Sequence, residues 1–226
     1  MEITMYDTLL QLPLFQGLCK DDFTNIIEKV KFHFHHFKAG ETLLTQGETC
    51  NRLVFLLDGT ISSHTLNPEQ NYHLTEIHHG PFIIEPYSLF GMQTTFMATY
   101  KAHTDVKLLT IDKSFILSDL NHYEIFRINY LNMLSNRCQY TANKLCNIHI
   151  GTLNGKFVDF FRHRCIRPEG EKNLRITMED LANIIGETRI NVSKLLNDLQ
   201  AKGLLQLRRK EIFIPALEKL AEELGY

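Results

Sequence analysis

Residues 176–203 contain a group of side chains that could hydrogen-bond to base edges and to phosphates of a DNA duplex. They face outward at the start of a predicted helix, where a recognition helix contacts DNA. Arginine can donate two hydrogen bonds to guanine, and hydroxyl, amide and ammonium groups can bond to phosphate oxygens. The members of this face are Arg189, Ile190, Asn191, Ser193, Lys194 and Asn197.

Two predicted helices must hold this face in place. Thr177 is an N-cap residue with Asp180 three positions later, as in a capping box, and Thr188 can cap the second helix. Gly186 lies between them, where a helix–turn–helix needs a tight turn. The apolar positions are Leu181, Ala182, Ile184 and Ile185 in the first helix and Val192, Leu195, Leu196 and Leu199 in the second. An ordinary helical hairpin is the alternative, and the caps, the small residues and the arginine together favour DNA binding.

A predicted β-hairpin follows these helices. It runs from Gly203 through Leu204 and Leu205 to residues 211–215, with basic residues near its tip. A hairpin of this kind forms the wing of a winged helix, and its positive charges can contact phosphates. The predicted DNA-contacting residues outside the second helix are therefore Thr177, Thr188, Arg208, Arg209 and Lys210.

The distribution of charge along the chain supports a second, nucleic-acid-binding domain. The whole chain has 24 Lys and Arg against 26 Asp and Glu, which gives a net charge of −2. Residues 1–150 have a net charge of −4, whereas residues 151–215 have a net charge of +4. Ten of the 11 histidines lie before residue 150. Such a shift indicates two domains, the second with a mild basic excess.

Length and composition place the chain among ordinary globular proteins. Its 226 residues suit one large domain or two small ones, and 44% of them are hydrophobic. No apolar run is long enough to span a bilayer, and the first residues do not resemble a secretion signal, so we expect a cytoplasmic protein. The five cysteines are widely spaced and predict free thiols. No enzyme motif or paired-carboxylate pattern is present, so we expect no catalytic residues.

The first half of the chain combines a helical start with a β-rich region. Residues 6–31 have apolar spacing typical of a helix, interrupted by Pro13 and Gly17. Residues 32–112 contain short runs of β-branched and aromatic residues separated by turns, which predict a small sandwich or barrel. Within this region Asp58 and Gly59 are a typical hairpin signal.

Residues 113–150 contain neither glycine nor proline and predict a short helix followed by a long one over 122–150. Small and apolar residues recur in the long helix at steps of three and four: Ile128, Leu131, Ser135, Cys138, Ala142 and Leu145. This heptad-like seam favours a homodimer, and packing against the chain's own β-domain is the alternative. Gly151 ends the helix, and residues 156–165 form another amphipathic segment.

Taken together, these segments resemble the Crp/Fnr family of bacterial transcription regulators over almost the whole chain. The resemblance rests on residues 38–48 and 53–59 in the front half and on residues 176–202 in the back half. It implies an α+β fold with three parts. These are a cyclic-nucleotide-binding-like effector domain of jelly-roll-like, double-stranded β-helix topology over 1–121, a long dimerisation helix over 122–150, and a winged helix–turn–helix over 151–226.

The resemblance also assigns DNA contacts. Arg189 matches the family's arginine that contacts a guanine, and Thr188 matches its phosphate-contacting hydroxyl. Ile190 stands where many members carry Glu, and Lys194 where many carry Arg. The resemblance therefore does not carry over the family's best-known operator half-site.

The effector pocket departs further from the family. In members that bind cyclic nucleotides, a Gly-Glu pair holds the ribose and an Arg-Ser or Arg-Thr pair neutralises the phosphate. This chain has Ile84-Glu85 and, approximately, Phe96-Met97 at those places, and no arginine lies between Arg52 and Arg127. A buried phosphate without a cation is costly, so we do not expect cAMP or cGMP to bind in the usual way. The candidate pocket residues are Ile84, Glu85, Phe96, Met97, Tyr100 and Thr141.

Two features in this half could indicate ligands of other kinds. Met92, Phe96, Met97 and Tyr100 suggest an apolar cavity, with core packing as the alternative. Three clustered histidines, His33, His35 and His36, could bind zinc or iron, but no carboxylate or thiol accompanies them in sequence. We therefore expect no metal and no cofactor.

The leading prediction is a homodimeric DNA-binding regulator with DNA, a second copy of itself and, by family resemblance, RNA polymerase as partners. Its β-roll would sense an unidentified small molecule. In one alternative the β-roll is only a dimerisation scaffold and the regulator needs no ligand. In another, from a different class, the protein is a small-molecule-binding module without DNA function.

Overall fold

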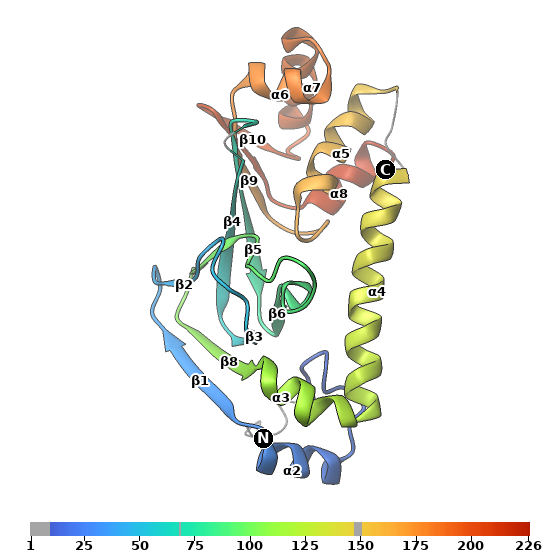
Figure 1. The fold of residues 1–226 in the computed structure, drawn as a ribbon. Helices are drawn as coiled ribbons and strands as arrows, with labels where there is room; N and C mark the ends of the chain where they lie inside the picture. The colour runs from blue at the N-terminus through green and yellow to red at the C-terminus, as the bar shows by residue number, and fades with distance from the viewer. Residues whose placement is uncertain (1–9, 68, 147–150) are drawn as a thin grey trace. The chain divides into compact units, whose positions relative to one another are not determined.

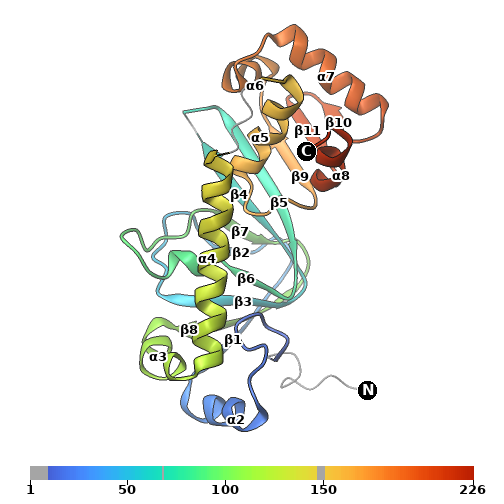
Figure 2. The same ribbon diagram turned by 90° about the vertical axis from the view of Figure 1, so that its right-hand side faces the viewer.

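The computed structural model describes residues 10–67, 69–146 and 151–226 (Figures 1 and 2). The chain divides into two compact units. The first comprises residues 1–62 and 78–138, and the second comprises residues 63–77 and 139–226. The second unit therefore includes a segment from the middle of the N-terminal half, which the sequence does not predict.

The first unit is an antiparallel β-roll. One of its sheets has the order β1-β8-β3-β6, and in the other β2 pairs with β7, which neighbours β4. The strands are β1 (Phe32–Phe37), β2 (Thr42–Leu44), β3 (Arg52–Asp58), β6 (Phe82–Ile84), β7 (Thr99–Ala102) and β8 (Val106–Asp112), together with the first residues of β4 (Thr60–Asn67), which continues into the second unit. These two sheets confirm the predicted jelly-roll-like architecture.

Aromatic rings hold helices against the first sheet. Phe15 lies at the centre, with its ring centroid 5.7 Å from that of Phe23, 5.8 Å from Phe55 and 5.6 Å from Phe126. Phe23 belongs to α2 (Lys20–Lys29). Within the predicted helical stretch over 6–31, residues 11–17 form turns around the two expected breaks, Pro13 and Gly17. Pro13 removes a backbone donor and Gly17 adopts φ +87°, so neither continues a helix.

The Asp58-Gly59 turn joins strands of different sheets and does not close the hairpin that its sequence predicts. Gly59 has φ +97°, and a Cβ atom there would lie 2.5 Å from the carbonyl oxygen of Asp105. Only glycine allows this close approach of two backbone segments. The same residue pair can therefore serve a hairpin or a crossover between sheets, and tertiary packing decides between them.

A short helix, α3 (Lys113–Ser118), and a 3₁₀ turn, η2 (Leu120–His122), lead into the long helix α4 (Glu124–Cys146). A long helix is thus confirmed, and the last four residues of its predicted span, 147–150, lie outside the described residues. On one side of α4, Phe126 and Tyr130 are buried, and the Tyr130 hydroxyl donates to the Pro86 carbonyl at 2.8 Å.

No helix in the described part of the chain is both long and apolar enough to cross a membrane.

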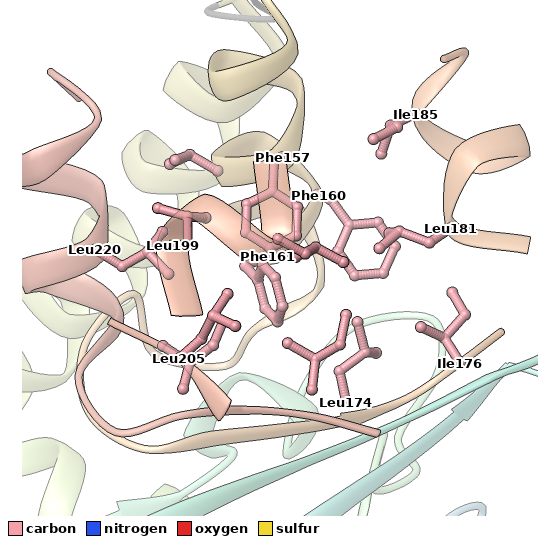
Figure 3. Packing of buried hydrophobic residues seen from close by; sticks show 14 of the residues in the cluster. Phe157, Phe160, Phe161, Leu174, Ile176, Leu181, Ile185, Leu199, Leu205 and Leu220 are labelled. Atoms are coloured by element: carbon pink, nitrogen blue, oxygen red, sulfur yellow. The ribbon is translucent and has the colours of Figure 1, made fainter. Parts of the chain in front are cut away.

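The second unit is a winged helical domain built around three phenylalanines of α5, namely Phe157, Phe160 and Phe161. Figure 3 shows these rings between Leu181 and Ile185 on one side and Leu199 and Leu220 on the other. The elements are α5 (Leu153–Arg164), β9 (Lys172–Arg175), α6 (Met178–Ile185), α7 (Arg189–Ala201), β10 (Gln206–Arg208), β11 (Glu211–Ile214) and α8 (Leu217–Glu223).

The sheet of this unit is completed by a strand from residues 63–77. Its order is β10-β11-β9-β5, where β5 (Tyr72–His79) pairs antiparallel with β9. Tyr72 and Leu74 of β5 are buried in the same core as the phenylalanines, and the Tyr72 ring meets Phe160 edge-on at 5.8 Å. The wing sheet therefore depends on a strand that lies about 100 residues earlier in the sequence than its neighbour.

A buried ion pair fixes the register of β5. Glu76 and Lys172 are directly opposite each other on β5 and β9, their charged atoms are 3.2 Å apart, and their side chains are 1% and 0% exposed. The Glu76 carboxylate also accepts from the backbone N–H groups of Ile166 at 2.6 Å and Arg167 at 3.2 Å. Lys172 also donates to the Glu169 carbonyl at 2.6 Å. These bonds satisfy both charges away from water.

We expect Lys172→Met to destabilise the second unit by about 3–5 kcal/mol, because it leaves the Glu76 charge buried without its cation. The measurement is denaturant unfolding of the full chain. The double variant Glu76→Leu/Lys172→Met removes both charges and should recover part of this loss. Lys202→Met is the matched control, because Lys202 pairs with Glu223 on the surface and should cost at most about 1 kcal/mol. Equal losses in the two lysine variants would contradict a structural role for the buried pair.

Candidate nucleic-acid interface

Helix α6 begins and ends where its sequence predicts. The Thr177 hydroxyl caps the helix by accepting from the backbone N–H of Asp180 at 3.0 Å. Gly186 follows the last helical residue with φ +65°, and its N–H bonds back to the carbonyl of Asn183. This left-handed residue lets the chain turn within two residues toward the next helix.

Helix α7 presents the predicted polar face. Thr188 caps it by accepting from the backbone N–H of Asn191 at 3.2 Å. The buried residues on its other side are Val192, Leu195, Leu196 and Leu199. The outward residues Thr188, Arg189, Ile190, Asn191, Lys194 and Asn197 are exposed, whereas Ser193 is half-buried and accepts from the Asn197 amide at 3.4 Å. The sequence-predicted residues of the helix thus lie on one accessible surface.

Lys156 forms an ion pair with Glu187, the acidic residue two positions before Arg189. Its ammonium lies 2.7 Å from the Glu187 carboxylate, and this bond, with a further one from Asn191, holds the pKa of Glu187 below its usual range. Among the described residues, none forms a hydrogen bond or ion pair with the Arg189 guanidinium. Sequence reasoning missed Lys156 because it lies 31 residues from its partner. The guanidinium is therefore free to bond to an external acceptor.

The wing carries the second group of candidate residues. Strands β10 and β11 pair with Arg208 opposite Glu211, so the turn consists of Arg209 and Lys210. Arg208, Arg209 and Lys210 are all exposed. The Lys210 carbonyl accepts from the Ile176 N–H at 3.1 Å, which ties the wing turn to the residue before the α6 cap. The three charges thus lie on a turn whose backbone is anchored.

The effector-pocket candidates differ in burial and belong to both units. Ile84, Glu85, Phe96 and Tyr100 are buried in the first unit. Met97 is 63% exposed and Met92 is fully exposed, so neither side chain is enclosed in the core. Thr141 is exposed on α4 and belongs to the second unit.

The histidines line a different part of the β-roll. His33 and His35 border an open hollow of about 380 Å³, together with Arg52, Thr110 and Asp112. The His35 ring bonds to the Thr110 hydroxyl at 3.0 Å, and burial together with the nearby His33 lowers the pKa of His35. In the part of the chain that the structure describes, no three His, Cys, Asp or Glu side chains are gathered closely enough to hold a metal ion.

A capped helix pair with an exposed basic face and an adjoining basic wing defines a winged helix–turn–helix DNA-binding protein, here with a separate β-roll unit. Comparison with family models agrees for both parts. Residues 34–123 match the cyclic nucleotide-binding domain, and residues 155–223 match the Crp-like helix-turn-helix domain. The chain belongs to the Crp/Fnr family and is a DNA-binding transcription regulator.

Individual relatives are distant. The chain is 24% identical over 193 residues to a CRP-like cAMP-activated global transcriptional regulator of Mycobacterium tuberculosis. The aligned region covers 82% of this chain and 85% of the relative. It is 24% identical over 221 residues to the fumarate and nitrate reduction regulatory protein of Escherichia coli, with 91% of this chain and 82% of the relative covered. Among solved structures, the catabolite activator protein of Thermus thermophilus matches with a TM-score of 0.54 and 19% identity, covering 94% of this chain and 99% of that one.

We expect Arg189 to set base preference and the wing to set general affinity. Arg189→Ala should cost about 1–3 kcal/mol of discrimination at one base position per half-site. Arg189→Lys is the matched control, because it keeps the charge and loses the two-pronged donor, so it should lose discrimination as well. The measurement is the affinity for a selected operator and for scrambled DNA over a range of salt concentrations.

The double variant Arg208→Ala/Arg209→Ala should weaken binding to both duplexes alike. Contacts to phosphate carry no base information, and each one lost per subunit should lower the salt slope by about one unit. The assigned roles would be wrong if Arg189→Ala weakened both duplexes equally, or if the wing variant lost discrimination between them.

Proposed function

We propose that this protein is a homodimeric, sequence-specific transcription regulator that acts in the cytoplasm, and that it is not an enzyme. The observation that carries the proposal is the exposed α7 face, where the Arg189 guanidinium has no partner among the described residues. Two such faces, one per subunit, would read two half-sites. RNA polymerase is the proposed protein partner. The proposed parts are an effector domain over 1–121, a dimerisation helix over 122–150 and a DNA-binding domain over 151–226.

The exposed side of α4 supports the dimer. Ile128 and Leu131 are 43% and 55% exposed, and Ser135, Cys138 and Ala142 continue the same stripe as exposed residues. Their heptad-like spacing suits packing against a parallel copy of the helix. Leu145, the last member of the predicted seam, lies outside the residues whose side chains are described.

Leu131→Glu should convert the dimer to monomers in sedimentation, because two carboxylates would meet in an apolar seam. DNA affinity should fall with it, since a monomer cannot bridge two half-sites. Asn136→Glu is the matched control, because Asn136 is exposed on α4 but lies off the seam. A dimer that survives Leu131→Glu would refute the seam assignment.

The β-roll is proposed to work without cAMP bound in the usual mode. Ile84 is buried where the resemblance places a glycine, and the phosphate-binding arginine has no counterpart. The effector is then an unidentified small molecule, or none is needed and the β-roll is a scaffold. A protein that bound a small molecule and failed to bind any duplex from a random pool would instead be a ligand-binding module.

Calorimetry should show no tight binding of cAMP or cGMP to the full chain. The reason is the absence of a guanidinium that could neutralise a buried phosphate. Low-micromolar affinity for either nucleotide would contradict the proposal. In that case Lys101→Ala would test whether the exposed Lys101 serves the phosphate.

A further inference from the structure

The Glu85 carboxylate is surrounded by four hydrogen-bond donors in the first unit. One oxygen accepts from the Met97 N–H at 2.7 Å and the Ser88 hydroxyl at 2.9 Å. The other accepts from the Ala98 N–H at 3.1 Å and the Tyr100 hydroxyl at 3.0 Å. Each oxygen thus receives one backbone and one hydroxyl donor, and Glu85 itself is only 2% exposed.

The arrangement of these donors is that of an anion-binding site. Two successive backbone N–H groups that point to one place form a concave anion site, and hydroxyl groups complete such sites. Ser88, Ala98 and Tyr100 are themselves buried, so without an acceptor their donors would be left without water. Among the described residues Glu85 makes no ion pair, so the site holds its anion with neutral donors alone.

The backbone at Glu85 adopts a left-handed conformation. Its φ of 39° and ψ of 55° lie in the left-handed region, which is uncommon for any residue other than glycine. The 3₁₀ turn η1 (Pro86–Ser88) follows directly, so the proline ring and the Ser88 bond help to hold the conformation. Residues in such conformations persist only where their surroundings enforce them, and they cluster at functional sites.

We propose that Glu85 is an internal anion that occupies an oxyanion-binding site of the β-roll, so that the roll needs no phosphate from a ligand. This inference rests on the proposed function, in which the roll does not bind cAMP in the usual way. Met97 is also one of the two residues at the position that the family resemblance gives to the phosphate-binding pair. The glutamate that would contact a ribose in relatives therefore takes the place of the phosphate here.

The test is to empty the site and offer a small carboxylate or phosphate in return. In Glu85→Ala, sodium acetate or inorganic phosphate should raise Tm of the full chain saturably, by about 3 °C at several times the dissociation constant. Sodium chloride at equal ionic strength corrects for screening. The wild type should show no saturable rise, because its site is already filled.

Glu48→Ala is the matched control. Glu48 also accepts a backbone N–H, that of Thr45, and pairs with Arg52, but its side chain is 38% exposed. Its removal leaves no buried anion site, so this variant should respond to acetate as the wild type does. The proposal is overturned if Glu85→Ala, Glu48→Ala and the wild type respond alike.

A second measurement applies if Glu85→Ala does not fold. In the ligand-free wild type, the Met97 and Ala98 amides should be protected from hydrogen exchange. Glu85→Gln, whose amide group offers only one acceptor oxygen, should speed exchange of at least one of them by about tenfold. Unprotected amides in the wild type would overturn the proposal. Tight cAMP binding by the wild type would instead contradict the proposed function, so the two failures are distinguishable.

Discussion

The ion pair between Glu76 and Lys172 is the constraint on which the winged unit depends. The pair is directly cross-strand, and the carboxylate also accepts two backbone N–H groups, so β5 can lie beside β9 in only one register without leaving charges unsatisfied. This register places Tyr72 and Leu74 in the core that supports α6 and α7. The position of α7 within its unit is therefore fixed partly by residues from the other half of the sequence.

The first unit also has a buried carboxylate that accepts from backbone N–H groups, but its other partners differ. Buried carboxylates need donors because burial removes their water, and both Glu76 and Glu85 take two of these donors from successive backbone N–H groups. Glu76 adds a cation, whereas Glu85 adds two hydroxyls. The β-roll thus satisfies a buried carboxylate with neutral donors alone, whereas the winged unit uses a cation as well.

The sequence predicts best what is decided locally. The caps at Thr177 and Thr188 and the turn at Gly186 involve bonds between residues three or four positions apart, and all of them form as expected. Two features that the sequence does not predict involve distant partners. Asp58-Gly59 joins two sheets because Asp105 packs against the glycine, and the donors of Glu85 follow it by up to 15 residues. Neither relation has a periodicity or a motif that a single sequence would show.

A partner that is distant in sequence also explains why Arg189 of α7 is unpaired. A free guanidinium beside a carboxylate would ordinarily pair with it, and Glu187 is only two residues away. Lys156, brought in by α5, engages that carboxylate instead. Ile190 adds no charge next to Arg189 and is 68% exposed, so the residue after the arginine offers it no competing acceptor. The unpaired state of the Arg189 guanidinium thus depends on Lys156 of α5 as well as on the helix–turn–helix motif itself.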